Sequence, residues 1–384
     1  MTPQAATGRV RLVPKRSSTF HDFPYAKPQR KCVHCWIINV TPPGFDHCTH
    51  QCVYCYARDA IFARDGRGTL EVYDNLPELV ARDLARLSLC PPISISNTTD
   101  PCQDVPELRR EVARLVRLLV ERGPSFLIVT KGDASFLLDI EGFAARPRKL
   151  VATTIEGPPD VLRLLSPRAP SFERRLESVR RLAAAGVNAV VRLDPVFPPV
   201  YEALYGGGWL AEVERLIGQF AGHGCRHVIC STGRLDRRPP RRPSALSTFA
   251  RLEGLLAALD ARAAAALRRD YVFDRSGTSA GYLWRRPERL DFHRRLRALC
   301  EAHGMTYASC QENAAEESDS ASVPSCEGFP LFVVPHYKSP SASSASMAAS
   351  SRSRAARASA TSPAAASRPR RAAAPSLSRP RRSS

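Results

Sequence analysis

Short apolar runs alternate with longer amphipathic segments over the first 232 residues of the chain. Six of these runs have the length and composition of buried strands, and they cover residues 36–40, 93–96, 126–129, 150–154, 189–193 and 227–230. The amphipathic segments predict helices over residues 57–64, 76–89, 105–122, 171–185 and 210–222. Alternating strands and helices predict a parallel sheet that is covered by helical crossovers.

This pattern indicates an α/β fold built from six βα units. Six units are too few to close an eight-stranded barrel, but the count is compatible with a partial (β/α)6 TIM-like barrel. Ligands of parallel α/β sheets bind at the carboxyl ends of the strands. Polar residues that follow the predicted strands are therefore candidates for a functional site, whereas the strand interiors form the core.

The composition fits a globular protein with a sizeable core, because the chain has 384 residues and 43% of them are hydrophobic. No stretch reaches the roughly 18 uncharged apolar residues of a membrane helix, and the amino terminus lacks the apolar run of a signal peptide. We therefore expect a cytoplasmic protein without membrane contact. Twelve cysteines in such a chain favour metal or redox chemistry over a disulfide framework.

Much of the positive charge lies in the carboxy-terminal tail. Ten of the formal +19 charges fall between Lys338 and Ser384, where no acidic residue occurs, so the rest of the chain carries +9. The tail consists almost entirely of Ser, Ala, Pro and Arg, a composition that predicts disorder over residues 337–384. It is either a basic arm for a polyanion such as nucleic acid or an extension without function.

Three cysteines lie close together after the first predicted strand. Cys48, Cys52 and Cys55 are spaced by three residues and then by two. Iron–sulfur clusters are normally held by four thiolates, so three thiolates predict a cubane with one iron left for a non-protein ligand. The alternative is a tetrahedral zinc site formed by two of these cysteines and nearby histidines. Those histidines are His34, His47 and His50.

The cysteine spacing resembles the signature of radical S-adenosylmethionine (radical SAM) enzymes, in which the open iron binds the amino and carboxylate groups of the cofactor. Tyr54, the aromatic residue before the last cysteine, fits that signature. Four later segments are similar to the spore photoproduct lyase-like branch of this family, and they follow in the same order: residues 96–101, 129–131, 166–175 and 191–198. The resemblance covers roughly residues 31–232.

This resemblance implies a partial barrel of the radical SAM type, with a [4Fe-4S] cluster on Cys48, Cys52 and Cys55 and with S-adenosylmethionine as the second cofactor. Reductive cleavage of S-adenosylmethionine would release a 5′-deoxyadenosyl radical, which abstracts hydrogen from a substrate. A reductant such as flavodoxin or ferredoxin is the expected partner, and the positive charge is compatible with a nucleic-acid substrate. Alternatively, the chain is a zinc- or cluster-containing nucleic-acid-binding protein without redox catalysis.

Polar residues at the ends of the second and third predicted strands are candidate cofactor contacts. Ser96, Asn97 and Asp100 follow the second strand. They either receive the polar groups of S-adenosylmethionine or build an Asx-type turn before Pro101. Lys131 ends the third strand and is expected to pair with the cofactor carboxylate or with an anionic substrate, unless it is a solvated surface lysine.

The fourth and fifth predicted strands also end in polar residues. In the family, the end of the fourth strand contacts cofactor or substrate, which implicates Thr153 and Thr154, although threonine is also an ordinary strand residue. Arg192 and Asp194 end the fifth strand. A buried arginine requires a partner, so Arg192 either faces the mouth of the barrel, which we favour, or neutralises an acid.

A second set of cysteines is widely separated along the chain. Cys32 and Cys35 precede the first strand, whereas Cys310 and Cys326 lie near the end of the folded region. They form either an auxiliary cluster or zinc site, or four separate thiols. The expected parts of the chain are an N-terminal extension (1–30), the partial barrel (31–235), a helical or mixed C-terminal extension (236–336) and the tail (337–384).

Overall fold

The computed structural model describes residues 9–22, 35–58, 60, 62–238, 245–275, 281–331 and 334–335. An eight-stranded sheet forms its centre, with the strand order β13-β10-β9-β8-β7-β6-β3-β2. Neighbouring strands run parallel except β2, which pairs antiparallel with β3. The strands are β2 (His21–Asp22), β3 (Trp36–Ile38), β6 (Ile93–Ile95), β7 (Phe126–Thr130), β8 (Lys149–Thr154), β9 (Ala189–Leu193), β10 (His227–Cys230) and β13 (Thr306–Ser309).

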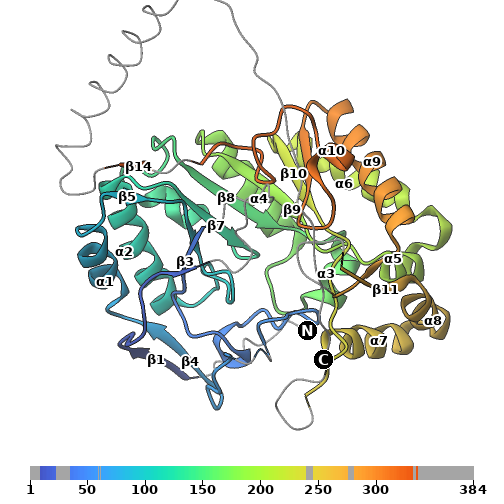
Figure 1. The fold of residues 1–384 in the computed structure, drawn as a ribbon, viewed down its shortest axis with the longest axis horizontal. Coiled ribbons are helices and arrows are strands. Elements are labelled where there is room, and N and C mark those ends of the chain that lie inside the picture. Colours follow the sequence, from blue (N-terminus) through green and yellow to red (C-terminus); the bar gives the residue numbers. More distant parts are fainter. Residues whose placement is uncertain are drawn as a thin grey trace, which may run out of the picture.

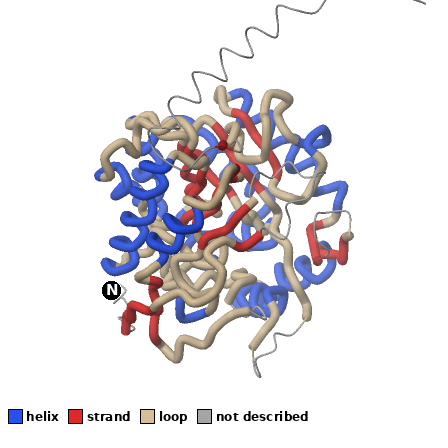
Figure 2. The backbone as a smooth tube through the Cα atoms, turned by 60° about the vertical axis from the view of Figure 1, so that its left-hand side comes forward, coloured by secondary structure: helices blue, strands red, loops and turns tan. Residues whose placement is uncertain are grey.

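Helices lie around this sheet, with α1 and α2 on the side of β3 and with α6 and α9 on the side of β10 (Figure 1). In the view of Figure 2, the strands at the centre have helices outside them, whereas other strands lie at the edge of the molecule. The helices are α1 (Leu76–Leu84), α2 (Pro106–Arg122), α3 (Pro159–Leu165), α4 (Phe172–Ala184), α5 (Pro198–Tyr205), α6 (Trp209–Gly222), α7 (Thr248–Leu259), α8 (Ala261–Asp270), α9 (Arg286–Ala302) and α10 (Ala315–Ser318), with 3-10 turns η1 (Phe45–His47), η2 (Ser135–Asp139) and η3 (Gly206–Gly208).

Three small strand pairs flank the main sheet. Strand β1 (Arg9–Val13) runs parallel to β4 (Thr69–Tyr73), and β11 (Tyr271–Asp274) forms an antiparallel hairpin with β12 (Gly281–Trp284). The third pair joins β5 (Leu89–Cys90) to β14 (Val334–Pro335). Within the described parts of the chain, no helix is long and apolar enough to span a membrane.

The six predicted strands are present as β3 and β6 to β10, and they pair in parallel, which confirms the α/β class. The sheet also has a seventh parallel strand, β13, which comes from the predicted C-terminal extension and pairs with β10. The extension and the barrel therefore share one sheet. The boundaries of the four parts stay predictions, and the tail lies outside the described residues.

The helix predicted over residues 57–64 is wrong, because none of the described residues in this range is helical. The backbone N–H of Arg64 donates to the carbonyl of Pro43 at 2.7 Å, which turns the segment back toward the start of the cysteine loop. The guanidinium of Arg58 lies 4.1 Å from the ring centroid of Phe45. These contacts with the preceding turn replace the hydrogen bonds that a helix would form.

The two faces of the sheet have separate cores, because successive strand residues point to opposite faces. The inner face holds a small core that includes Leu127, Leu150, Ala152, Val190 and Ile229. Intervening residues such as Ile128, Val151 and Val191 pack in the larger core beneath the helices. The same alternation decides which residues at the carboxyl ends of the strands reach the interior of the barrel.

Candidate active site

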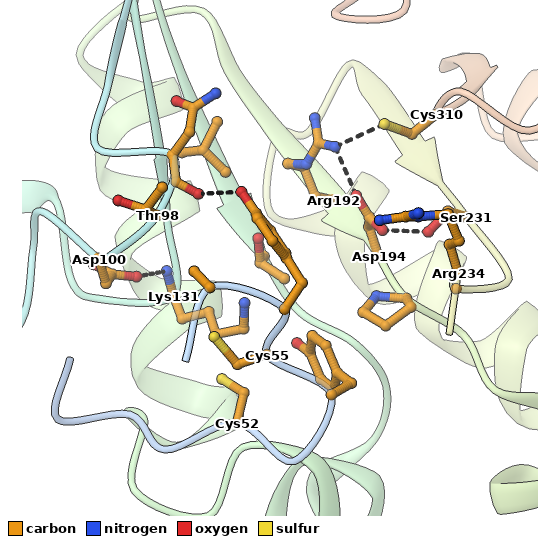
Figure 3. A pocket seen from close by; sticks show the side chains of 18 of the residues that line it. Cys52, Cys55, Thr98, Asp100, Lys131, Arg192, Asp194, Ser231, Arg234 and Cys310 are labelled. Carbon is orange, nitrogen blue, oxygen red and sulfur yellow. Dashed lines mark hydrogen bonds and ion pairs between the residues drawn. The ribbon is translucent and has the colours of Figure 1, made fainter. Parts of the chain in front are cut away.

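A cavity of about 370 Å³ opens at the carboxyl ends of the parallel strands. One side of it, which we name the cysteine wall, consists of Cys48, Cys52, Cys55, Ser96, Asn97 and Lys131. The opposite side, the distal wall, consists of Arg192, Asp194, Ser231, Cys310, Glu312 and Glu327. Figure 3 shows Cys52 and Cys55 at one end of this space and Arg192, Asp194 and Cys310 at the other. The cavity therefore brings together side chains from distant parts of the sequence.

The loop that carries the three cysteines is fixed by residues from two other βα units, those of β6 and β8. The side chain of Gln103, which is fully buried, accepts a hydrogen bond from Thr49 N at 2.7 Å and donates one to His47 O at 3.2 Å. On the other side, Val53 N donates to Leu165 O at 2.9 Å. These bonds satisfy backbone groups of an irregular loop, so the loop is held in place before any ligand binds.

The thiols of the loop fit an iron–sulfur cluster better than a single ion. Burial raises the pKa of Cys48 to about 12 and raises the pKa of Cys52 well above its usual range, so a bound metal must displace their protons. Among the described residues, no group of three or more His, Cys, Asp and Glu side chains converges closely enough to hold one metal ion. In a cubane each thiolate binds a different iron, so close convergence is not required.

The histidines of the zinc alternative have other contacts or cannot be placed. His47 Nδ1 accepts from Glu71 N at 3.2 Å, and His50 Nδ1 lies 3.4 Å from the carboxylate of Asp100. His34 lies outside the described residues. All three thiols line the open cavity, and the chemistry of this donor set fits the cluster.

Asp100 builds the turn that follows β6. Its carboxylate accepts hydrogen bonds from Cys102 N at 2.8 Å, from the Thr130 hydroxyl at 2.6 Å and from Lys131 N at 2.6 Å. Burial alone would raise the pKa of Asp100, but His50 and these donors hold it well below its usual range. The Asx-type turn is therefore present, and the carboxylate is largely occupied by protein groups although it borders the cavity.

Ser96 and Asn97 combine a structural contact with a place in the cavity. Ser96 has a φ of 55° in the left-handed region, and its hydroxyl accepts from Val40 N at 3.1 Å. The side-chain oxygen of Asn97 accepts from the Ser94 hydroxyl, and its backbone carbonyl accepts from the hydroxyl of Tyr56 at 2.9 Å. Both residues line the cavity beside the cysteines, as the sequence predicts.

Lys131 belongs to a buried charged network behind the cysteine loop. Its ammonium lies 3.8 Å from Glu156 and 5.5 Å from the centroid of the Tyr54 ring. Glu156 also accepts from the Tyr54 hydroxyl and pairs with Arg175 at 2.6 Å. Burial would raise the pKa of Glu156, but Arg175 and Lys131 hold it below its usual range. Lys131 is thus only partly exposed and has protein partners, and Tyr54 is anchored by its hydroxyl.

Arg175 ties this network to the segment that precedes α4. Its guanidinium donates to Pro170 O at 2.8 Å, to Thr154 O at 3.1 Å and to the Ser166 hydroxyl at 2.9 Å. This arginine is fully buried, and Glu156 neutralises its charge. Residues 166–175 therefore form a turn that is organised around one internal cation.

The structure places Thr154 at the cavity and Thr153 on the other face of β8. Leu150 and Ala152 lie in the inner core, so Thr154, two residues further, points to the same face. Thr153 shares its face with Val151 and is fully buried on the side of the helices. Strand alternation thus separates two neighbouring threonines that the sequence treats as equivalent.

Arg192 faces the cavity and also neutralises acids, so both interpretations of this residue hold. Its guanidinium donates to Asp194 at 2.6 Å, to Glu327 at 3.1 Å and to the sulfur of Cys310 at 3.1 Å. Ser231 in turn donates to Asp194 (Figure 3). The distal wall is therefore a connected polar surface that joins β9 to two segments near residues 310 and 327.

The second set of cysteines does not come together as one site. Cys35 precedes β3 at the amino end of the strands, whereas Cys310 follows β13 at the carboxyl end, and these strands lie near opposite edges of the sheet. Cys310 lines the cavity, while Cys326 is buried, with its carbonyl accepting from His227. Cys32 lies outside the described residues. Four-fold ligation by this set is thus excluded by the positions of Cys35 and Cys310.

Several residues at the site were not expected from the sequence. Gln103 and Glu156 follow the carboxyl ends of strands. The rule that polar residues at these ends are site candidates, which selected Lys131 and Arg192, applies to them as well. Glu312 and Glu327 come from the extension, and their position depends on β13 joining the sheet. That pairing is long-range, and no local pattern indicates it.

Comparison with known proteins identifies the domain around the cysteine loop. Residues 43–203 match the model of the Radical SAM superfamily. The uncharacterized protein Rv2578c of Mycobacterium tuberculosis is 24% identical over 198 residues, which are 49% of this chain and 56% of that protein. A radical SAM Nalpha-GlyT isomerase of Pseudomonas phage M6 is 22% identical over 288 residues, which are 71% of this chain and 53% of that protein. The chain thus spans about half the length of these curated relatives.

The fold is similar to that of spore photoproduct lyase. A structure of that enzyme complexed with dinucleoside spore photoproduct superposes with a TM-score of 0.56 at 16% sequence identity, covering 79% of this chain and 83% of the lyase. The parallel sheet, the matched domain and the cysteine loop agree with one another. The domain formed by residues 43–203 is thus that of the radical SAM superfamily, and the fold of the chain is similar to that of spore photoproduct lyase.

Proposed function

We propose that the chain is a radical SAM enzyme in which Cys48, Cys52 and Cys55 hold a [4Fe-4S] cluster. When bound, the cluster supplies the electron that cleaves S-adenosylmethionine to methionine and a 5′-deoxyadenosyl radical, which then abstracts hydrogen from the substrate. The observation that carries this proposal is the position of all three thiols on one wall of a cavity at the carboxyl ends of the strands.

The other residues of the cysteine wall would bind and orient S-adenosylmethionine. The ammonium of Lys131 is a suitable partner for the cofactor carboxylate, because it faces the cavity and its position is fixed by Glu156. Ser96, Asn97 and the edge of Asp100 offer oxygen acceptors to the cofactor ammonium. The distal wall would hold the substrate, since it lies across the cavity from the cysteines. Most of its residues also lie outside the matched domain.

Anaerobic purification tests this function directly. The expected protein is brown, contains about four irons and four sulfides per chain, as a cubane requires, and forms 5′-deoxyadenosine when dithionite and S-adenosylmethionine are added. A matched variant with Cys52→Ala should be colourless and inactive. A colourless wild-type protein that contains one zinc ion would instead support the nucleic-acid-binding alternative.

We propose nucleic acid as the first substrate class to test. The solved lyase with a similar fold is complexed with a dinucleoside. In this chain, half-exposed Phe273 contacts the Tyr282 ring edge-on, and the guanidinium of Arg237 lies 4.4 Å from the centroid of the same ring. Exposed aromatic rings with arginines are typical of surfaces that stack single-stranded bases.

Fluorescence anisotropy with a labelled single-stranded oligonucleotide measures this affinity. Phe273→Ala is expected to weaken binding about 5- to 150-fold, the effect of losing one base–aromatic stack of about 1–3 kcal/mol. Wild-type affinity should also fall as salt is raised. Arg295→Ala is the control, because this exposed arginine on α9 pairs with Asp291 away from the hairpin. Equal affinities of all three proteins would exclude this surface as the binding site.

A further inference from the structure

The last cysteine of the loop is held by a residue of the C-terminal extension. Arg251, in the first turns of α7, donates a hydrogen bond from Nη2 to the carbonyl oxygen of Cys55 at 2.7 Å, across 196 residues of sequence. Arg251 lies well beyond residues 43–203, the part that matches the radical SAM model. A positive charge from outside the matched domain therefore lies against a cysteine of the proposed cluster.

The position of Arg251 is fixed by the way α7 begins. The Ser247 hydroxyl caps the helix by accepting from Ala250 N at 3.1 Å. Phe249 N donates to Asp236 O at 3.1 Å, and Asp236 N donates to the Thr248 hydroxyl at 2.7 Å. The first turn of α7 is thus bonded to the segment that leaves the barrel after β10. Because both ends of this connection are fixed, the guanidinium is directed at the loop before any ligand binds.

We infer that Arg251 is a positioning residue that holds Cys55 and raises the reduction potential of the cluster. This inference rests on the proposed function. Reduction adds one electron, supplied by an external reductant, and no bond is formed or broken in that step. The reduced form carries one more negative charge, so a nearby guanidinium stabilises it more than the oxidised form. Net charge and hydrogen bonding around the ligands are the means by which proteins set such potentials.

Two substitutions separate the charge from the shape of the side chain. Arg251→Gln keeps a hydrogen-bond donor but removes the charge, whereas Arg251→Lys keeps the charge on a different donor. Arg268→Gln is the matched control, because Arg268 lies on α8 of the same extension and forms a surface ion pair with Glu253. Each protein is studied as the full chain after anaerobic reconstitution with iron and sulfide.

The test is a potentiometric titration with dithionite and mediators, followed by EPR. Arg251→Gln should reduce the equilibrium constant for one-electron reduction at least tenfold, a midpoint potential about 59 mV lower. Arg251→Lys should lie between this value and the wild type, and Arg268→Gln should match the wild type. If Arg251→Gln folds but loses iron while Arg251→Lys retains it, the positioning role is supported by the iron content instead.

Other outcomes overturn the inference. An unchanged midpoint potential and full iron content in Arg251→Gln would show that the contact is only structural. If Arg251→Gln does not fold, a wild-type potential in Arg251→Lys together with loss of the Cys55 contact in its crystal structure would lead to the same conclusion. Failure of the proposed function is distinguishable, because the wild type itself would then bind no cluster.

Discussion

The two walls of the cavity differ in where their residues come from and in how their charges are balanced. The cysteine wall is built from loops within residues 43–203, and its charged residues are paired inside the same domain. Lys131 and Glu156 are examples of such pairing. The distal wall depends on Arg192, which joins Asp194 of the barrel to Glu327 of the extension. In the proposed function, cofactor chemistry and substrate recognition therefore depend on different parts of the sequence.

This difference explains why the family is evident and the substrate is not. The cysteine wall is assembled from contiguous segments whose spacing is visible in the sequence. The distal wall requires β13 to pair with β10 and requires residues 310–327 to fold back over the strand ends. Relatives that share the first wall can therefore differ in the second and act on different substrates. The following experiments test the separation of the two walls.

The largest expected effect is loss of the cluster. Each of Cys48→Ala, Cys52→Ala and Cys55→Ala should abolish it, because two thiolates do not retain a cubane. Cys310→Ala, on the distal wall, should retain full iron and sulfide content and the EPR signal. Iron and sulfide analysis with EPR of the reduced protein measures both. A full cluster spectrum in any of the first three variants, or its loss in the fourth, would contradict the assignment of the walls.

The next largest effect concerns the charged network behind the cysteine wall. Arg175→Met leaves Glu156 buried without its closest cation, so the free energy of unfolding should fall by about 3–5 kcal/mol. Urea denaturation measures this free energy. Arg180→Met on the same helix removes an exposed ion pair with Glu177 and should leave stability close to that of the wild type, because water and salt screen such a pair. Similar values for the two variants would show that the buried pair is not required.

The third largest expected effect is on the affinity for S-adenosylmethionine, which should differ between variants of the two walls. Lys131→Met is expected to weaken S-adenosylmethionine binding by about 1.5–3 kcal/mol, the cost of a charge-assisted hydrogen bond. Arg192→Met should leave that affinity within about twofold, because Arg192 lies on the distal wall. A twofold change is well below the tenfold that 1.4 kcal/mol represents. Titrating the reduced cluster with S-adenosylmethionine and following its EPR signal provides both dissociation constants. The assignment fails if Arg192→Met has the larger effect.

The smallest expected effect is an increase in the free energy of unfolding. The hydroxyl of Thr153 is buried and has no hydrogen-bond partner among the described residues. Thr153→Val removes this polar group while keeping the shape, so it should raise the free energy of unfolding by about 1 kcal/mol without changing cofactor affinity. Thr154→Val is the control on the cavity-facing side. A loss of cofactor binding in Thr153→Val would place this hydroxyl in the site after all.

The sequence predicts what depends on local patterns and misses what depends on distant pairing. Apolar runs predict the six central strands, and cysteine spacing predicts which thiols line the cavity. Strand β8 is buried on both faces, so its sequence does not show that Thr154 rather than Thr153 reaches the cavity; the structure decides this by placing Leu150 and Ala152 in the inner core. In contrast, the position of Glu327 depends on a fold-back over 135 residues from Arg192, for which no local signal exists.

The predicted helix over residues 57–64 shows a different limit. Its composition is compatible with a helix, but Arg64 bonds to Pro43 and the chain continues into β4, which pairs with β1 near the amino terminus. Tertiary contacts therefore decide the conformation of a segment whose local preference is weak. The strands and most helical crossovers of the barrel are therefore predicted from local patterns, whereas this connection depends on contacts with distant residues.

The contact between Arg251 and Cys55 has a consequence for the order of biosynthesis. A ribosome that adds about 5–20 residues per second completes the cysteine loop about 10–40 s before it completes α7, since 196 residues separate the two. During that interval the loop lacks the hydrogen bond at Cys55. Once the extension folds, Arg251 holds the last of the three cysteines by its backbone carbonyl. If the proposed cluster is delivered to the nascent chain, it would therefore meet a loop that can still adjust to it.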